Sequence, residues 1–201
     1  LMKDLKICGE ITLPVHHCLI SKSKELKKIT SIYAHGQSLA QCHDWIANNL
    51  PNAEKITVLS NAEGAKIASK EKHSAAIASS RAASIFRLNV LQNHIEDEPN
   101  NTTRFLILSD QEISPSGNDK TSIVVATKNK PGAIVDLIQP FAARKVSLTK
   151  LESRPSRIGM WEYVFFIDIE GHRDDAKIKL CLKDIEKKSS FMKFLGSYPK
   201  N

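Results

Sequence analysis

A hydroxyl and a guanidinium stand side by side just before an apolar stretch of the chain, and together they could bind an anion. Residues 101–105 read Asn-Thr-Thr-Arg-Phe, and an apolar run follows to Leu108. At a strand edge, Arg104 could bind a carboxylate through two hydrogen bonds, and the Thr103 hydroxyl could donate one more. A loop in which the threonine caps a turn and the arginine is solvated fits the same spacing.

Two segments in the last third of the chain have residue types that suit a small ligand. Residues 152–155 read Glu-Ser-Arg-Pro at the end of an expected strand, where they could form a ligand loop or an interface. A surface ion pair that adds little stability is the alternative. Residues 131–133, Pro-Gly-Ala, open an expected helix, so their backbone amides could face a carboxylate. An ordinary tight turn between strand and helix explains them equally well.

The histidines and cysteines form no recognisable metal motif. His16 and His17 are neighbours on an expected strand, so their side chains face opposite sides and cannot share one ion. The other histidines show no ligand spacing: His35, His43, His73, His94 and His172. Among cysteines 8, 18, 42 and 181 there is no Cys-x-x-Cys pair. We therefore expect reduced thiols and no metal.

Composition excludes several classes of protein. Of the 201 residues, 41% are hydrophobic and 25% charged, which excludes wholesale disorder. No apolar run approaches the roughly 18–20 residues of a membrane span, and no signal peptide opens the chain, so a cytoplasmic protein without membrane contacts is expected. The net charge of +7 could attract nucleic acid or small anions. Because the lysines are dispersed without interleaved aromatics, a solvated basic surface is the favoured interpretation and no nucleic acid partner is expected.

Strand-like and helix-like segments alternate in the first half, which favours an α/β fold with a mostly parallel sheet. Strands are expected at residues 10–20, 29–34, 55–59, 75–78 and 105–108, and helices at 38–49, from 60 onward and at 81–88. The run Ser60-Asn61-Ala62-Glu63 has the form of a capping box, which predicts the start of a helix.

After a polar segment at residues 113–120 the pattern changes. Strands are expected at 121–126, 146–152, 162–169 and 191–197, and helices at 132–143 and 174–188. This βαββαβ order is typical of a ferredoxin-like fold, in which an antiparallel sheet carries helices on one face. The sequence therefore predicts two domains, at residues 1–112 and 120–201.

Several motifs, in order along the chain, resemble prephenate dehydratase with its C-terminal ACT regulatory domain. Residues 17–19 resemble its His-Cys-Leu strand, and residues 33–42 its Tyr-Ser-His-Pro-Gln-Ala-Leu-Ala-Gln-Cys segment. Residues 103–105 match Thr-Arg-Phe, residues 132–135 resemble Gly-Ala-Leu-Val, and residues 152–155 match Glu-Ser-Arg-Pro. Each motif is weak alone, but their joint order is specific.

The resemblance implies a two-lobed, periplasmic-binding-protein-like catalytic domain followed by the ACT domain. The first lobe, with its Pro-Glu-Asn motif, would precede Gly9 and has no counterpart in these residues. We therefore expect the second lobe at residues 1–112 and a C-terminal fragment of a longer protein, with or without a fused chorismate mutase.

The resemblance also implies an activity, that of a carbon–oxygen lyase. The family removes water and carbon dioxide from prephenate, giving phenylpyruvate for phenylalanine biosynthesis, with no cofactor. Thr103 and Arg104 are the catalytic candidates, since the threonine hydroxyl could stabilise the leaving hydroxide. Expected substrate-binding residues are Gln41, Ser60, Asn61, Ala62 and Phe105.

For the ACT domain, the resemblance implies feedback inhibition by L-phenylalanine in a homodimer or higher homo-oligomer. Backbone amides of one domain would hold the amino acid, and a segment of the paired domain would close over it. The residues concerned are Gly132, Ala133, Ile134, Glu152, Ser153, Arg154 and Pro155. Two other hypotheses remain open: a truncated phenylalanine-sensing module without catalysis, and a basic nucleic-acid-binding protein.

Overall fold

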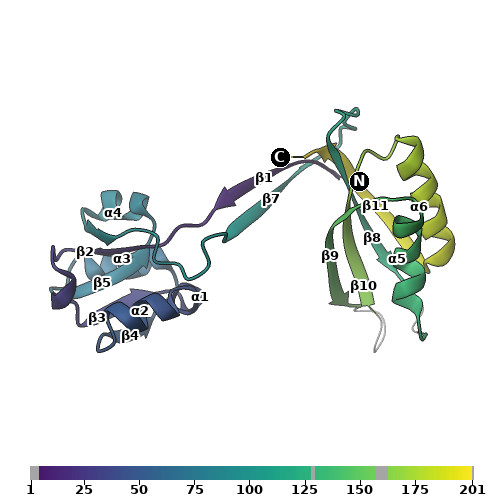
Figure 1. The fold of residues 1–201 in the computed structure, drawn as a ribbon. Coiled ribbons are helices and arrows are strands. Elements are labelled where there is room, and N and C mark those ends of the chain that lie inside the picture. The colour runs from purple at the N-terminus through teal and green to yellow at the C-terminus, as the bar shows by residue number, and fades with distance from the viewer. Residues whose placement is uncertain (1–4, 128–129, 157–162, 201) are drawn as a thin grey trace. The chain divides into compact units, whose positions relative to one another are not determined.

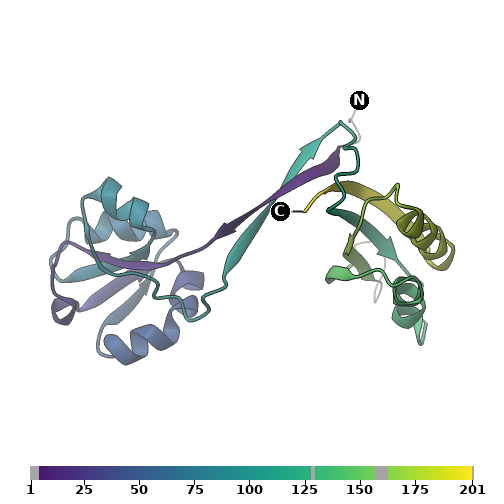
Figure 2. The same cartoon turned by 45° about the horizontal axis from the view of Figure 1, so that its top comes forward.

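The computed structural model describes residues 5–127, 130–156 and 163–200, and the chain divides into two compact units. Unit 1 comprises residues 1–12 with 104–201, and unit 2 comprises residues 13–103. Two strands run from one unit into the other, β1 (Lys6–Pro14) and β7 (Thr102–Ser109). They pair as a two-stranded sheet and lie side by side in both views (Figures 1 and 2). Among the described residues, no helix has the length and apolar character needed to cross a membrane.

Unit 2 is built on a five-stranded sheet in the order β4-β3-β5-β2-β6. Its strands are β2 (Cys18–Ser21), β3 (Ser31–Ala34), β4 (Glu54–Thr57), β5 (Ser74–Ala78) and β6 (Asn89–Gln92). β3 runs parallel to β4 and β5, whereas β2 runs antiparallel to β5 and β6. The α/β class expected from the sequence is thus present with a mixed sheet, and β6 is a strand that the sequence pattern did not indicate.

Helices cover both faces of this sheet. They are a 3-10 turn (Leu26–Lys28), α1 (Gly36–Gln41), α2 (His43–Asn49), α3 (Asn61–Ala68) and α4 (Ser80–Phe86). Because neighbouring side chains on a strand face opposite sides, Leu19 packs in one core with Ile46 of α2, and Ile20 in the other with Ala65 of α3. Every residue of β5 is buried, as its run of small residues predicts.

Two expected elements are each divided in the structure. The strand expected at residues 10–20 is two strands, β1 and β2, and the helix expected at 38–49 is two helices that meet at Cys42. The Asp97 carboxylate accepts hydrogen bonds from the backbone N–H groups of Asp44 (3.1 Å) and Trp45 (3.0 Å), so it caps α2 as a separate helix. This cap comes from 53 residues away and leaves no local signal in the sequence.

The start of α3 is fixed by its own capping contacts and by a close approach to β3. The Ser60 hydroxyl accepts a hydrogen bond from the Glu63 N–H (3.1 Å), as the capping-box pattern predicts. The Glu63 carboxylate accepts a hydrogen bond from the N–H of Leu59 (2.9 Å), one residue before the cap. A Cβ atom at Gly64 would lie 2.7 Å from the carbonyl oxygen of Tyr33. Only glycine therefore allows α3 to pack this closely.

Unit 1 contains a four-stranded antiparallel sheet in the order β11-β8-β10-β9. Its elements are β8 (Asp119–Ala126), α5 (Ala133–Ala143), β9 (Leu148–Pro155), β10 (Tyr163–Glu170), α6 (Ala176–Lys188) and β11 (Phe191–Pro199). Both helices lie on one face (Figure 1), where Phe141 and Ile178 pack on Ile123 and Ile167. The ferredoxin-like order expected from the sequence is thus present. Residue 162, where β10 was expected to begin, lies outside the described residues.

Candidate functional site

A polar cavity of about 360 Å³ lies in unit 2, beyond the carboxyl ends of the parallel strands β3 and β4. This is where α/β sheets commonly bind ligands. The lining residues are Val15, His17, His35, Gln37, Ser38, Gln41, Leu59, Ser60, Asn61, Asn101 and Thr103. None of these described lining residues is acidic, and most carry neutral donors or acceptors. The cavity therefore suits a polar or anionic small molecule.

Hydrogen bonds between the lining residues fix their positions. The Asn61 side chain accepts a hydrogen bond from the His35 N–H (2.9 Å) and donates one to the Ser38 hydroxyl (2.8 Å). These bonds join the starts of α1 and α3, the helices that follow β3 and β4. The Nε2 of His17 lies 2.9 Å from the amide oxygen of Gln41. Because that oxygen can only accept, Nε2 carries the proton, and the Gln41 amide nitrogen can donate to a ligand.

The amino-terminal end of α3 adds a favourable field for an anion. Ser60 and Asn61 stand at this end and line the cavity. The first N–H groups of a helix lack partners within the helix, and the helix dipole places partial positive charge there. The Glu63 N–H is already bonded to the Ser60 hydroxyl, and the Glu63 carboxylate in the first turn offsets part of this positive charge. The remaining first-turn N–H groups would stabilise a carboxylate in the cavity.

Thr103 lines the cavity from β7. Its side chain is exposed, and within the described part of the chain its hydroxyl has no hydrogen-bond partner. The preceding segment is held in place, because the Asn101 carbonyl accepts a hydrogen bond from the Val15 N–H at 2.8 Å. The threonine hydroxyl is therefore available to a ligand.

Arg104, the next residue on β7, bonds within unit 1. Its Nε donates to Glu10 (2.6 Å), its Nη1 pairs with Asp168, and its Nη2 donates to the Tyr198 phenol (2.6 Å). Lys120 also pairs with Glu10, at 2.6 Å. Burial alone would raise the pKa of Glu10, but Lys120 and Arg104 outweigh burial and lower it. The structure thus gives Arg104 an ion-pairing role that the sequence did not indicate.

Ser122 completes this network and fixes the direction of its hydrogen bonds. Its hydroxyl donates to Asp168 at 2.5 Å, so the phenol of Tyr198, 2.7 Å away, donates to Ser122. Burial raises the pKa of Tyr198 to about 12, which keeps the phenol protonated at neutral pH. Among the described residues, no buried side-chain polar atom lacks a partner.

The structure separates the expected substrate-binding residues into two groups. Those that line the cavity are Gln41, Ser60 and Asn61. Ala62 lies in the first turn of α3 outside the lining, and Phe105 lies on β7 in unit 1 with 52% of its surface exposed. The sequence reasoning did not select His17, although it belongs to the His-Cys-Leu motif that could have pointed to it.

A second cavity, of about 320 Å³, lies at the start of α5 in unit 1. Its lining residues are Thr127, Lys130, Gly132, Ala133, Ile134, Val135, Tyr163 and Phe165. Gly132 precedes α5 with a φ of 78°, a conformation that favours glycine. The expected phenylalanine-binding residues 132–134 thus border a cavity with apolar side chains and one cation.

The segment 152–155 lies on the edge strand β9 and does not line that cavity. Its Glu152 carboxylate accepts hydrogen bonds from Arg154 (2.7 Å) and Lys150 (2.8 Å). The Arg154 guanidinium also lies 5.1 Å from the centre of the Phe166 ring. Within one subunit, these side chains contact their own sheet, and their contact with a bound amino acid stays a prediction.

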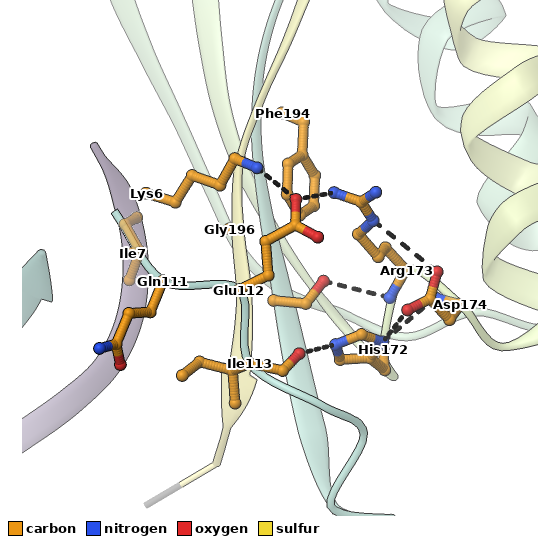
Figure 3. Close-up of a pocket in the computed structure, with 11 residues that line it drawn as sticks. Lys6, Ile7, Gln111, Glu112, Ile113, His172, Arg173, Asp174, Phe194 and Gly196 are labelled. Atoms are coloured by element: carbon orange, nitrogen blue, oxygen red, sulfur yellow. Dashed lines mark hydrogen bonds and ion pairs between the residues drawn. The ribbon is translucent and has the colours of Figure 1, made fainter. Parts of the chain in front are cut away.

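A third hollow, also in unit 1, is too small for a metabolite (Figure 3). Its volume of about 20 Å³ suits a single water molecule. Lys6 and Arg173 both reach Glu112, at 2.5 and 3.5 Å, and the His172 Nε2 donates to the Ile113 carbonyl at 3.0 Å. These contacts anchor the segment that follows β7.

Comparison with known proteins gives matches along most of the chain. The family model for prephenate dehydratase matches residues 1–113, and the model for the ACT domain matches residues 121–187. The boundaries expected from the sequence, 1–112 and 120–201, stay a prediction, since contacts group residues 104–112 with unit 1.

Individual relatives support the same assignment. A bifunctional chorismate mutase/prephenate dehydratase from Stutzerimonas stutzeri is 49% identical over 198 residues, which cover 98% of this chain and 54% of that protein. A prephenate dehydratase from Methanocaldococcus jannaschii is 36% identical over 201 residues, which cover 98% of this chain and 72% of that protein. The chain thus spans about half the length of the bifunctional relatives it matches.

A solved structure gives the fold. The crystal structure of a prephenate dehydratase from Arthrobacter aurescens, in complex with L-Phe, matches with a TM-score of 0.85 and 33% identity. The match covers 100% of this chain and 68% of that one. These likenesses confirm the expected fold class, and the sequence and structural matches together show that this chain belongs to the prephenate dehydratase family.

Proposed function

We propose that this chain is part of a cytoplasmic prephenate dehydratase, a lyase that makes phenylpyruvate for phenylalanine biosynthesis. The observation that carries the proposal is the Thr103 hydroxyl, which is without an internal partner in the described part of the chain and borders a cavity of neutral donors. Family membership and the names of the relatives support the choice of substrate.

The charge of the cavity fits a substrate with two carboxylates. The amino-terminal end of α3 and the Gln41 amide nitrogen would bind carboxylate oxygens, and the acid-free lining would not repel them. This part of the site would position the substrate through neutral groups, which hydrogen bonds to other lining residues already hold in place.

The proposed reaction breaks two bonds of the substrate ring. The bond to the ring carboxylate breaks and releases carbon dioxide, while its electron pair enters the ring and makes it aromatic. The carbon–oxygen bond on the opposite side of the ring breaks, and the hydroxide that leaves takes a proton from solvent to become water. The Thr103 hydroxyl donates a hydrogen bond to the departing oxygen, where negative charge develops in the transition state.

The test is Thr103→Ala in the full-length protein that contains this chain, assayed by phenylpyruvate formation. We expect kcat to fall about a hundredfold, because one donor to the developing charge is lost. Thr103→Ser should restore most of the activity, and Thr102→Ala, on the neighbouring strand position outside the cavity lining, should leave it unchanged. Normal kcat in Thr103→Ala would overturn the role of this residue.

For unit 1, we propose that the cavity at the start of α5 binds L-phenylalanine as a feedback inhibitor. Ile134 and Phe165 supply an apolar wall for the ring, and the first-turn N–H groups of α5 can bind the carboxylate. Residues 152–155 of a second subunit would close over the ligand, which requires a homodimer. Phenylalanine binding by a full-length protein without dehydratase activity would favour the second hypothesis, a sensing module.

A further inference from the structure

Two histidines and a glutamate meet on the surface of unit 2, outside the cavity lining. His16 precedes β2, and His94 and Glu96 follow β6. The Nδ1 of His16 lies 2.8 Å from the Oε1 of Glu96, and the Nδ1 of His94 lies 3.3 Å from the same oxygen. The two Nδ1 atoms are 3.2 Å apart. We refer to these three residues as the His16–His94–Glu96 cluster.

Hydrogen bonds satisfy this triangle only when both Nδ1 atoms carry protons and donate to the same carboxylate oxygen. If the Nδ1 of one imidazole carries a proton, it can donate to Glu96, but the second Nδ1 is then left facing the same two atoms. If both Nδ1 atoms carry protons, both N–H groups can donate to Oε1, with the two nitrogens 3.2 Å apart. If neither Nδ1 carries a proton, three lone pairs face each other. A cation at the centre of the triangle would satisfy all three ligand atoms at once.

The triangle also has the size of one face of a metal coordination shell. Ligand atoms about 2.0–2.1 Å from zinc stand about 2.9 Å apart at a right angle and about 3.3 Å apart at the tetrahedral angle. The observed edges are 2.8, 3.2 and 3.3 Å. Imidazole nitrogen with one carboxylate oxygen suits zinc, cobalt, nickel or copper better than magnesium or calcium.

We propose that the His16–His94–Glu96 cluster binds one divalent transition-metal ion through the Nδ1 atoms of both histidines and the Oε1 of the glutamate. The side chains of His16 and His94 are 46% and 66% exposed, which gives an ion access and leaves its remaining positions to water. Three protein ligands with open positions are a common zinc arrangement. No spacing pattern in the sequence indicates this site, because the two histidines lie 78 residues apart.

The carboxylate of the cluster is held in position by the protein. The Glu96 side chain is 3% exposed, and its Oε2 accepts a hydrogen bond from the backbone N–H of His17 at 2.9 Å. The neighbouring Ile95 N–H donates to the His17 carbonyl at 3.0 Å. Such outer contacts orient a metal ligand before the ion arrives.

An ion at this site would join the segment before β2 to the segment after β6. It would also stand next to the candidate active site, because the His17 side chain, whose backbone holds Glu96, contacts Gln41 in the cavity wall. Binding should therefore raise the thermal stability of unit 2, since an ion that binds only the folded state stabilises it.

The proposal is tested by titrating the purified protein, free of any polyhistidine tag, with ZnCl₂ in a calorimeter. The wild-type protein should bind one zinc ion per chain. His16→Ala and His94→Ala should each weaken the affinity by more than about tenfold, because even outer partners of a ligand are worth that much. His43→Ala removes an exposed histidine of α2 outside the cluster and should leave the affinity unchanged.

Two further measurements identify the ligand atoms. Side-chain ¹⁵N spectra should show zinc-dependent shifts at the Nδ1 of His16 and His94, and Co²⁺ absorption should lack a cobalt–thiolate band. Both histidines are exposed, so their alanine variants should keep the wild-type circular dichroism spectrum. Zinc binding that survives in both variants, a thiolate band, or binding only at millimolar zinc would overturn the proposal, and the dehydratase assay on the same samples tests the proposed function separately.

Discussion

Thr103 and Arg104 are consecutive residues of β7, yet Thr103 borders the polar cavity of unit 2 and Arg104 forms ion pairs with Glu10 and Asp168 in unit 1. Successive side chains on a strand face opposite sides, so one strand can serve both purposes. The ion pairs fix the strand one residue away from the proposed catalytic hydroxyl. The buried network is therefore expected to matter for activity as well as for stability.

Arg104→Leu should destabilise the protein strongly. It leaves the buried carboxylates of Glu10 and Asp168 without their guanidinium, and loss of one partner of a buried ion pair typically costs about 3 kcal/mol or more. Urea unfolding followed by circular dichroism measures the change. The control is Arg154→Leu, which removes a 63%-exposed arginine and should cost less than about 1 kcal/mol. Equal losses in the two variants would contradict the assigned role.

Acid should weaken the same network through Glu10. Because its pKa in the folded protein is lowered from 4.5, its contribution to the free energy of unfolding is fully present above pH 4.5 and is lost as the pH falls through the folded-state value. The stability difference between wild type and Glu10→Gln should therefore be largest at neutral pH and shrink below pH 4.5. Urea titrations at several pH values measure it, and a difference that grew in acid would show that the ionised Glu10 carboxylate does not stabilise the fold.

Gly64→Ala should destabilise the protein, although alanine normally favours a helix by about 1 kcal/mol. A new Cβ atom would lie 2.7 Å from the Tyr33 carbonyl oxygen, so α3 would have to move away from β3. Gly36→Ala is the matched control, because its Cβ would meet only the Thr57 methyl at 3.6 Å. The melting temperatures of both variants measure the effect. Unchanged stability in Gly64→Ala would show that α3 can shift without loss of folding free energy.

L-Phenylalanine should bind to the full-length protein and stabilise the proposed dimer, since a ligand held by two subunits favours the paired state. Calorimetry compares the wild type with a Ser153→Ala/Arg154→Ala variant, which should bind more weakly. Lys183→Ala, an exposed change on α6, is the control. Equal affinity in the wild type and the double variant would remove segment 152–155 from the binding site.

Features with local causes could be predicted from the sequence, and features with distant causes could not. The start of α3 follows from Ser60 and Glu63, three residues apart, and the buried β5 follows from its own small side chains. The division between α1 and α2 depends on Asp97, and the partners of Arg104 lie 64 and 94 residues away. For Asp97 and Arg104, residue type and local spacing carry no signal, because their partners are brought near only by the fold.

The β1–β7 ribbon has a practical consequence for handling the protein in solution. Phe105 and Ile107 share one face of β7, and Leu106 and Leu108 share the other. All four are between 44% and 56% exposed, on a sheet of only two strands. A two-stranded sheet with apolar side chains exposed on both faces promotes aggregation as the protein concentration rises. In light scattering of this chain, such aggregates would raise the apparent mass just as specific dimers do. Subunit pairing should therefore be measured in a Leu106→Lys variant, in which this aggregation is reduced.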